Sequence, residues 1–141
     1  RFKFFKDFSY IIGVFYRTIN LSFHSMELEI DGEIISGENC FVEFCNSRYT
    51  GGNMLMAPDA KIDDGFMDII VAGKMSRISL LATLPKIFKG THVKHPAVSC
   101  FTAKKAKIKT WPEKTLLPDG EIFGVTPATI MVHHKMVRYL N

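Results

Sequence analysis

Apolar and polar residues alternate along most of this chain, and short turn signals separate the alternating runs. Met26 to Ile30 alternates in this way, Asp31-Gly32 follows, and Glu33 to Ile35 resumes an apolar stretch. Such alternation predicts half-buried strands, and an Asp-Gly pair between two strands is typical of a tight β-hairpin. The pattern therefore predicts a hairpin near the start of a β region.

Further strands are predicted by short apolar or alternating runs that end at Gly, Pro, Asn or Asp residues. Their number and spacing favour an antiparallel arrangement. These strands are Cys40 to Cys45, Phe66 to Val71, Val98 to Ala103, Ala106 to Thr110, Glu121 to Phe123, Ala128 to Val132 and Met136 to Leu140.

A helix is predicted from Phe2 to Ile19, where apolar residues recur at alternating steps of three and four. Its longest uncharged run, Phe8 to Tyr16, is too short to span a bilayer. The helix could pack into a core or lie on a membrane surface, and its apolar residues on several sides favour packing.

A second helix is predicted from Ser76 to Gly90. Ser76 is a suitable N-cap and Gly90 a suitable stop, while Pro85 should kink or split the helix. The predicted fold class is mainly β (α+β), a single antiparallel β-sandwich-like domain over residues 1–141 with two flanking helices.

The composition fits a globular domain, with 47% hydrophobic residues and 12% aromatic residues. The net charge of +4 permits attraction to phosphate or anionic lipid without selecting either. Basic residues are scattered, apart from Lys104-Lys105 and Lys107 to Lys109, and no nucleic-acid motif accompanies them. A nucleic-acid partner is therefore not expected.

Cysteine usage favours a reducing compartment, since Cys40, Cys45 and Cys100 are odd in number and irregularly spaced. The pairs His92/His95 and His133/His134 lack partners at ligand spacing, so they are weak zinc signals. The chain opens on Arg1 with no signal peptide, and we expect it to be a piece of a longer protein.

The stretch from Asn46 to Asp68 concentrates glycines and carboxylates between two apolar runs. It contains Gly51-Gly52, Ala57-Pro58-Asp59 and Asp63-Asp64-Gly65. Carboxylates beside glycine turns suit a hard cation with oxygen ligands, and loops of this length are uncommon unless they bind something. Two ordinary turns in a β protein are the alternative interpretation.

Asp-Gly-Glu occurs twice, at Asp31 to Glu33 and at Asp119 to Glu121. The predicted hairpin explains the first copy completely. The second copy follows Pro118, and by itself it would also be interpreted as a plain turn.

Five ordered motifs together resemble the C-terminal domain of the diacylglycerol kinase and sphingosine kinase superfamily, which includes bacterial lipid kinases. The resemblance runs from about Glu38 to the end of the chain and extends more weakly over the preceding helix. The motifs are Asn46 to Met54, Ala57 to Gly65, Met75-Ser76-Arg77, Lys94-His95-Pro96 and Asp119-Gly120-Glu121.

This resemblance implies the acceptor-binding half of a two-domain lipid kinase that uses ATP and Mg²⁺. The chain contains no GxxxxGK and no Gly-Gly-Asp-Gly, so we expect the ATP site in an N-terminal nucleotide-binding domain outside it. The chain alone is then expected to be inactive. The implied partners are a lipid substrate, the cytoplasmic membrane surface as a peripheral site and that N-terminal domain, and a homodimer is compatible with them.

The resemblance also implies roles for individual residues. Lys61, Asp64 and Phe66 would bind magnesium through two carbonyls and one carboxylate. Glu121 would be the base or orienter for the lipid hydroxyl, and Asp119 would hold the network or a catalytic magnesium. Pro118 departs from the family pattern, which usually has an aliphatic residue there.

Methionines and phenylalanines could line an adaptable acyl pocket or form ordinary core. Two other functions remain open at this point. One is a non-catalytic lipid-binding or regulatory module of the same fold, and the other is a kinase of a small polyol or nucleotide-like acceptor.

Overall fold

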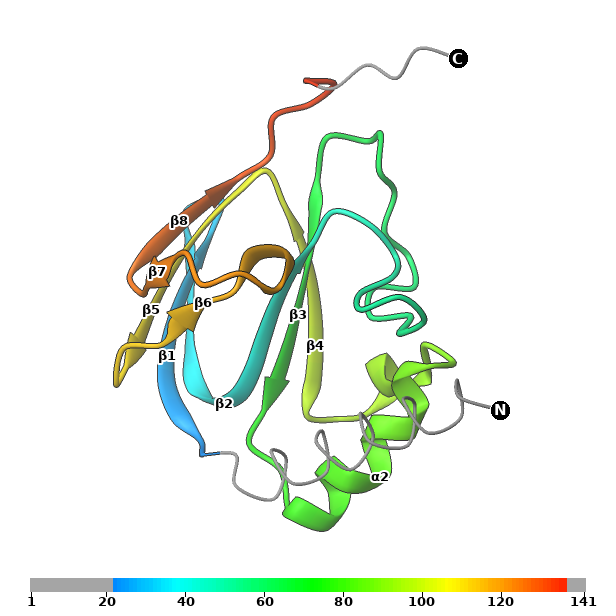
Figure 1. The fold of residues 1–141 in the computed structure, drawn as a ribbon. Helices are drawn as coiled ribbons and strands as arrows, with labels where there is room; N and C mark the ends of the chain where they lie inside the picture. The colour runs from blue at the N-terminus through cyan, green and yellow to red at the C-terminus, as the bar shows by residue number, and fades with distance from the viewer. Residues whose placement is uncertain (1–21, 137–141) are drawn as a thin grey trace.

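The computed structural model describes residues 22–136, which form eight strands, one α-helix and two short 3₁₀ helices (Figure 1). The helix predicted from Phe2 to Ile19 and all but the first residue of the strand predicted from Met136 to Leu140 lie outside this range. The strands are β1 (His24–Ile30), β2 (Glu33–Cys45), β3 (Met67–Gly73), β4 (Val98–Ala103), β5 (Lys105–Trp111), β6 (Thr115–Leu116), β7 (Gly124–Val125) and β8 (Ala128–Met131). The helices are α2 (Arg77–Ile87), η1 (Thr91–Lys94) and η2 (Pro118–Gly120).

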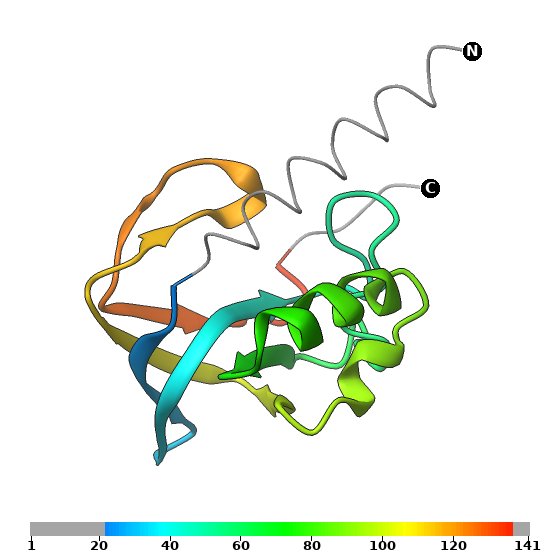
Figure 2. The same ribbon diagram turned by 90° about the horizontal axis from the view of Figure 1, so that it is seen from below.

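Six strands form one antiparallel sheet in the order β4-β3-β2-β1-β5-β8. Strands β6 and β7 pair separately as a small hairpin between β5 and β8. Figures 1 and 2 show a strongly curved sheet, with the β6–β7 hairpin standing out as an arm on the side of the molecule away from α2. The predicted class, a mainly β antiparallel sandwich-like domain, is confirmed.

The main core lies on the inner face of the curved sheet. Strand β5 shows the reason, since its residues are alternately exposed and buried along its whole length. Side chains that alternate in this way place every second residue on one face, and the curvature brings the inward residues of distant strands together. The buried members are Met26, Leu28, Met67, Ile69, Val71, Ala103, Ala106 and Ile108.

A second cluster covers the other face of the sheet near β2 and β3. Cys45 and Ile70 point to this face, and the loop residues Met56, Ala57 and Ala60 pack on them. The long loop after β2 is therefore part of the packed structure rather than a free connector. Ile87 at the end of α2 also contacts this cluster.

Helix α2 departs from its predicted limits at the C-terminal end. Ser76 is the N-cap, and its Oγ accepts a hydrogen bond of 3.1 Å from the Ser79 N–H, as predicted. Pro85 does not split the helix, because it lies in the last turn and removes only one hydrogen bond there. The helix ends at Ile87, and Gly90 adopts a left-handed conformation with φ of 67°.

Two strand predictions are corrected. The runs at Glu33 to Ile35 and Cys40 to Cys45 belong to one continuous strand, β2, which absorbs a β-bulge between Asn39 and Phe41. The strand predicted at Glu121 to Phe123 does not form. Only Thr115–Val125 and Leu116–Gly124 pair in this hairpin, because left-handed backbone at Asp119 and Gly120 turns the chain before pairing can begin.

Candidate functional site

The loop after β2 is held in shape by hydrogen bonds within itself and to the sheet. The Thr50 hydroxyl donates to the Glu43 carboxylate on β2, and the Thr50 and Met54 backbones bond to each other at 2.9 and 3.3 Å. The Arg48 side chain donates from Nε to the Pro58 carbonyl at 2.7 Å. These contacts fix the Gly51-Gly52 turn on one side and the Ala57-Pro58-Asp59 turn on the other.

Glu43 anchors this loop to β2, and sequence analysis did not single it out. Burial raises the pKa of this carboxyl, and hydrogen bonds from Thr50 and Cys45 offset part of that rise. Burial also raises the pKa of the neighbouring Cys45 thiol, to about 12, with the Glu43 and Asp68 charges adding to the effect. Cys45 is therefore a protonated core thiol rather than a nucleophile.

The predicted magnesium loop is an exposed turn with a defined geometry. Oδ1 of Asp64 accepts a hydrogen bond of 2.9 Å from the Phe66 N–H, which closes an Asx-type turn. Gly65 has φ of +80°, and a Cβ atom there would lie 2.9 Å from Nδ1 of His134. His134 therefore lies close to this turn, and the positive φ of Gly65 favours glycine there.

Negative charge accumulates around this turn. The pKa of Asp68 is raised by burial first, and then by the charges of Asp64 and Asp59. The Lys104 ammonium lies over the Phe66 ring, 5.1 Å from its centroid. Three carboxylates thus share a region in which a bound cation would relieve their mutual repulsion.

The residues Lys61, Asp64 and Phe66 carry oxygen donors of the kind that a hard cation binds. Because Oδ1 of Asp64 is used by the Phe66 N–H, Oδ2 remains for a ligand. No hydrogen bond from residues 22–136 reaches the Lys61 carbonyl. One carboxylate and two carbonyls are suitable oxygen donors, with water as the remainder. Within the same described range, no group of three or more His, Cys, Asp or Glu side chains is arranged to hold a metal.

The second predicted motif forms the tip of the β6–β7 hairpin. Asp119 has a left-handed backbone with φ of 49°, and Gly120 follows with φ of 86°. The Glu121 N–H donates to the Pro118 carbonyl at 3.0 Å, and the Phe123 N–H to the Leu116 carbonyl at 3.1 Å. Pro118 has no backbone N–H to donate, so it begins the turn without disrupting any strand pairing.

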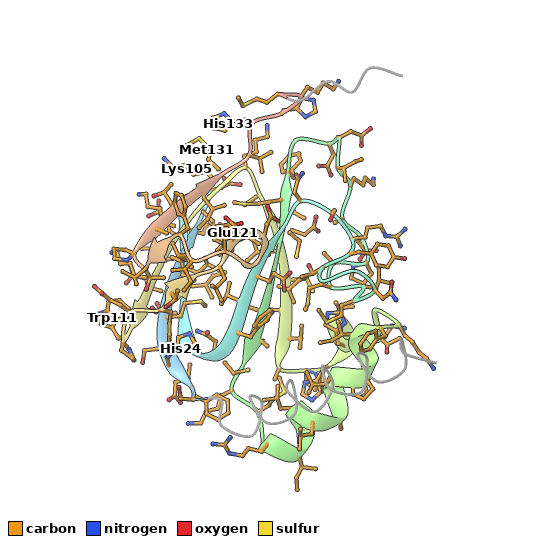
Figure 3. All side chains as sticks on the ribbon, in the orientation of Figure 1. His24, Lys105, Trp111, Glu121, Met131 and His133 are labelled. Atoms are coloured by element: carbon orange, nitrogen blue, oxygen red, sulfur yellow. The ribbon has the colours of Figure 1, made fainter. Side chains whose placement is uncertain are left out.

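Glu121 directly follows this turn, and Figure 3 labels it apart from Trp111 and His133. Residues 22–136 give the Glu121 side chain no hydrogen-bond or ion-pair partner. Its neighbours Ile122 and Phe123 are each 81% exposed, although both are large apolar side chains. Leu117 and Val125 on the same hairpin are also exposed. A free carboxylate is thus surrounded by unburied apolar surface.

The structure keeps the two sets of predicted residues on separate elements. Asp119 and Glu121 belong to the β6–β7 hairpin, whereas Lys61, Asp64 and Phe66 belong to the loop before β3. Within residues 22–136, no hydrogen bond or ion pair joins the two sets. His134 and Lys104 lie against the predicted magnesium loop, and the sequence could not link them to it because they are distant along the chain.

Two histidines near α2, His92 and His95, have structural contacts. His92 is buried, and its Nε2 lies 3.0 Å from the Met56 carbonyl, so the ring anchors the loop after β2. His95 Nε2 lies 2.7 Å from the Ser79 hydroxyl, while its Nδ1 accepts from the Ala97 N–H at 3.1 Å. In the neutral ring, Nε2 must then donate to Ser79. This direction is opposite to that needed to activate a serine nucleophile.

Comparison with known proteins finds similar diacylglycerol kinases. A diacylglycerol kinase of Mycobacterium tuberculosis (strain CDC 1551 / Oshkosh) is 38% identical over 104 residues, covering 73% of this chain. A diacylglycerol kinase of Staphylococcus aureus (strain JH9) is 29% identical over 124 residues, covering 88% of the chain. The crystal structure of a diacylglycerol kinase from Bacillus anthracis str. Sterne superimposes with a TM-score of 0.71 at 25% identity, covering 89% of the chain.

The chain spans only part of each of these proteins. It covers 33% of the M. tuberculosis protein, 39% of the S. aureus protein and 42% of the B. anthracis chain. The family model of the YegS C-terminal NAD kinase beta sandwich-like domain matches residues 1–141. The chain therefore belongs to the family of YegS C-terminal domains, whose relatives here are diacylglycerol kinases.

Proposed function

We propose that this chain is the acceptor-binding half of an ATP- and Mg²⁺-dependent lipid kinase, in which Glu121 is the base or orienter for the lipid hydroxyl. The observation that carries the proposal is the β6–β7 tip, where an unpaired carboxylate lies beside exposed Ile122 and Phe123. An acceptor with a hydroxyl head and an apolar tail matches both features. The similarity to proteins named diacylglycerol kinase supports the same class of acceptor.

The chemistry requires such a carboxylate because a lipid alcohol is a weak nucleophile at neutral pH. Glu121 accepts the hydroxyl proton as the oxygen attacks the γ-phosphate of ATP, and the bond between the γ-phosphorus and the bridging oxygen breaks. Asp119 is two residues away on the same rigid turn and holds the hydrogen-bond network around the reacting groups. The turn supplies position and charge, which are the main demands of phosphoryl transfer.

This scheme includes two magnesium sites. Lys61, Asp64 and Phe66 would hold an ion that braces the loop before β3, and Asp119 would face an ion that accompanies ATP. A bound Mg²⁺ would supply charge neutralisation for phosphate oxygens. ATP itself would bind an N-terminal nucleotide-binding domain, which the diacylglycerol kinases have room for in the length that this chain does not cover.

The protein is proposed to act at the membrane surface. No helix among residues 22–136 has the length and apolar character needed to cross a bilayer. Peripheral attachment at the cytoplasmic face would bring the exposed apolar side chains of the β6–β7 hairpin to the lipid. The mildly basic net charge of +4 would assist binding to anionic headgroups.

A lipid panel tests the proposal. The intact protein would be incubated with ATP, Mg²⁺ and mixed micelles that contain diacylglycerol, monoacylglycerol or sphingosine, and phosphorylated lipid would be measured. We expect one acceptor class to be phosphorylated in a Mg²⁺-dependent manner. Binding of these lipids without any phosphorylation would instead favour the non-catalytic module, and phosphorylation of glycerol alone would favour a small polyol acceptor.

A further inference from the structure

Two polar side chains on the inner face of the sheet have buried atoms without hydrogen bonds. They are His24, through Nδ1, and Asn39, through both its amide nitrogen and its amide oxygen. Asn39 is only 1% exposed, and nothing in residues 22–136 bonds to these three atoms. A buried amide that lacks all its partners is strongly unfavourable, so native proteins seldom retain one without a ligand or water.

Strand register places the two side chains next to each other on the core side. His24 pairs directly with Asn39 between β1 and β2, and residues paired across a ladder point to the same face. Asn39 also pairs with Gly73 of β3. Gly73 lies two residues from buried Val71, so both residues are on the same face of β3. Figure 3 shows His24 at the end of β1 that lies farthest from His133. The pairing with β1 and the pairing with β3 thus both place the Asn39 side chain on the inner face of the sheet.

The surroundings of this pair select a neutral ligand. Burial, and then the charge of Lys114, lower the pKa of His24, so the ring is neutral near pH 7. The nearest inward side chain on the same strand, Met26, is apolar, and its partner across the ladder, Thr110, has its hydroxyl paired with that of Thr126. A cation would lose its hydration there and be repelled by the Lys114 charge, while Asn39 and the neutral His24 offer a ligand hydrogen bonds but no charge.

We propose that His24 and Asn39 form a binding site for a neutral hydroxyl group on the inner face of the sheet. The Asn39 amide can donate to the hydroxyl oxygen, and a ring nitrogen of neutral His24 can accept its proton. Two sources share this chemistry. One is an ordered water, and the other is a second hydroxyl of the lipid acceptor, which rests on the proposed function and requires the β6–β7 tip to bring Glu121 close to this pair when the acceptor binds.

Thermal unfolding of the Asn39→Leu variant tests the site, because leucine has a similar volume and no polar atoms. If a hydroxyl group occupies the site, the variant loses its hydrogen bonds and the Tm of the intact protein falls by several degrees. If the amide is simply unsatisfied, its removal relieves a cost and the Tm rises. Ser36→Leu, on an exposed, outward-facing position of β2, is the matched control and should leave Tm nearly unchanged.

His24→Phe provides a second variant and a test of coupling. It keeps an aromatic ring and removes both ring nitrogens. Because the two residues share one ligand, the Tm loss of the double variant should be clearly smaller than the sum of the two single losses. Additive losses would mean that His24 and Asn39 act separately, which overturns the shared site.

A kinetic comparison then distinguishes water from the acceptor. Monooctanoylglycerol carries two hydroxyls and dioctanoylglycerol carries one, so only the former retains a free hydroxyl while the other reacts. If the acceptor fills the site, Asn39→Leu should lower kcat/KM for monooctanoylglycerol about tenfold relative to dioctanoylglycerol. An unchanged ratio with a lowered Tm identifies water.

An unchanged or raised Tm, together with an unchanged kinetic ratio, overturns the proposal. The unfolding measurements need no catalysis, so they still decide whether water occupies the site if the intact protein phosphorylates neither lipid. In that case the proposed function fails while the hydroxyl site is judged by Tm alone.

Discussion

The hydroxyl oxygens of Thr110 and Thr126 lie 2.6 Å apart and are buried where the β6–β7 hairpin joins β5. The Thr126 hydroxyl also accepts from the Lys114 N–H at 2.9 Å, and the Thr126 N–H donates to the Lys114 carbonyl at 2.8 Å. One threonine therefore fixes both ends of the hairpin that carries Asp119 and Glu121. The position of the proposed base depends on this anchor.

Replacing Thr126 by valine should destabilise the protein by about 1–3 kcal/mol. Valine preserves the shape but leaves the buried Thr110 hydroxyl and the Lys114 N–H without their partner. Chemical denaturation of the intact protein would measure the change. Thr129→Val, at an exposed position on β8, is the control. Equal stability of the two variants would mean that the threonine pair contributes nothing to folding.

The sheet could be predicted from the sequence because alternation marks its inner face so regularly. Strand β5 is the clearest case, since every second residue is buried. Local patterns could not reveal that β2 is continuous, because Ser36 to Glu38 lacks apolar residues and is exposed, and pairing with β1 overrides that composition. The same limit explains the error at Glu121 to Phe123, where apolar composition predicted a strand but turn geometry prevents pairing.

The candidate site was predictable only where a motif is contiguous. Asp63-Asp64-Gly65 and Asp119-Gly120-Glu121 could be recognised because each turn is built from neighbours in sequence. The contact between Gly65 and His134 joins residues from distant parts of the chain, so no local pattern reports it. The unpaired atoms of His24 and Asn39 were likewise invisible, since strand register alone brings those residues together.

Glu43→Gln should stabilise the protein at neutral pH. Burial raises the pKa of Glu43 above its usual value of 4.5, so the folded state holds this proton more tightly than the unfolded state does. The resulting contribution to stability is full below about pH 4.5 and is lost as pH rises through the folded-state pKa. Glutamine can still accept the Thr50 hydrogen bond without carrying a charge.

Thermal unfolding from pH 4 to pH 8 would check this sign. The Tm advantage of Glu43→Gln over the parent should be largest near pH 8 and should shrink towards about pH 4.5. Glu113→Gln, at an exposed position, should show no such trend. A lower Tm for Glu43→Gln at pH 8 would show that the ionised carboxylate is favourable in the folded protein.

Magnesium should stabilise the protein through Asp64. At Mg²⁺ concentrations about ten times the dissociation constant, the expected gain is about 1.4 kcal/mol, seen as a rise in Tm. Asp64→Asn should abolish most of this rise, because the amide can keep the Phe66 hydrogen bond but provides no charge for the cation. Asp63→Asn, the exposed neighbour, should keep it. Equal magnesium shifts in both variants would refute the assignment of Lys61, Asp64 and Phe66.

Glu121→Gln should reduce turnover of the intact protein about a hundredfold or more, while Glu33→Gln should leave it nearly unchanged. Both glutamates follow Asp-Gly and both are exposed. They differ in their surroundings, since Glu33 begins β2 in a regular β1–β2 hairpin, whereas Glu121 lies at an irregular turn between unburied apolar side chains. Glutamine keeps the shape and removes the basic oxygen, so the Tm of both variants should remain close to that of the parent. Lipid phosphorylation assays at saturating ATP would measure the two rates. Near-normal turnover in both variants would make Glu121 structural, and the base would then have to come from outside this domain.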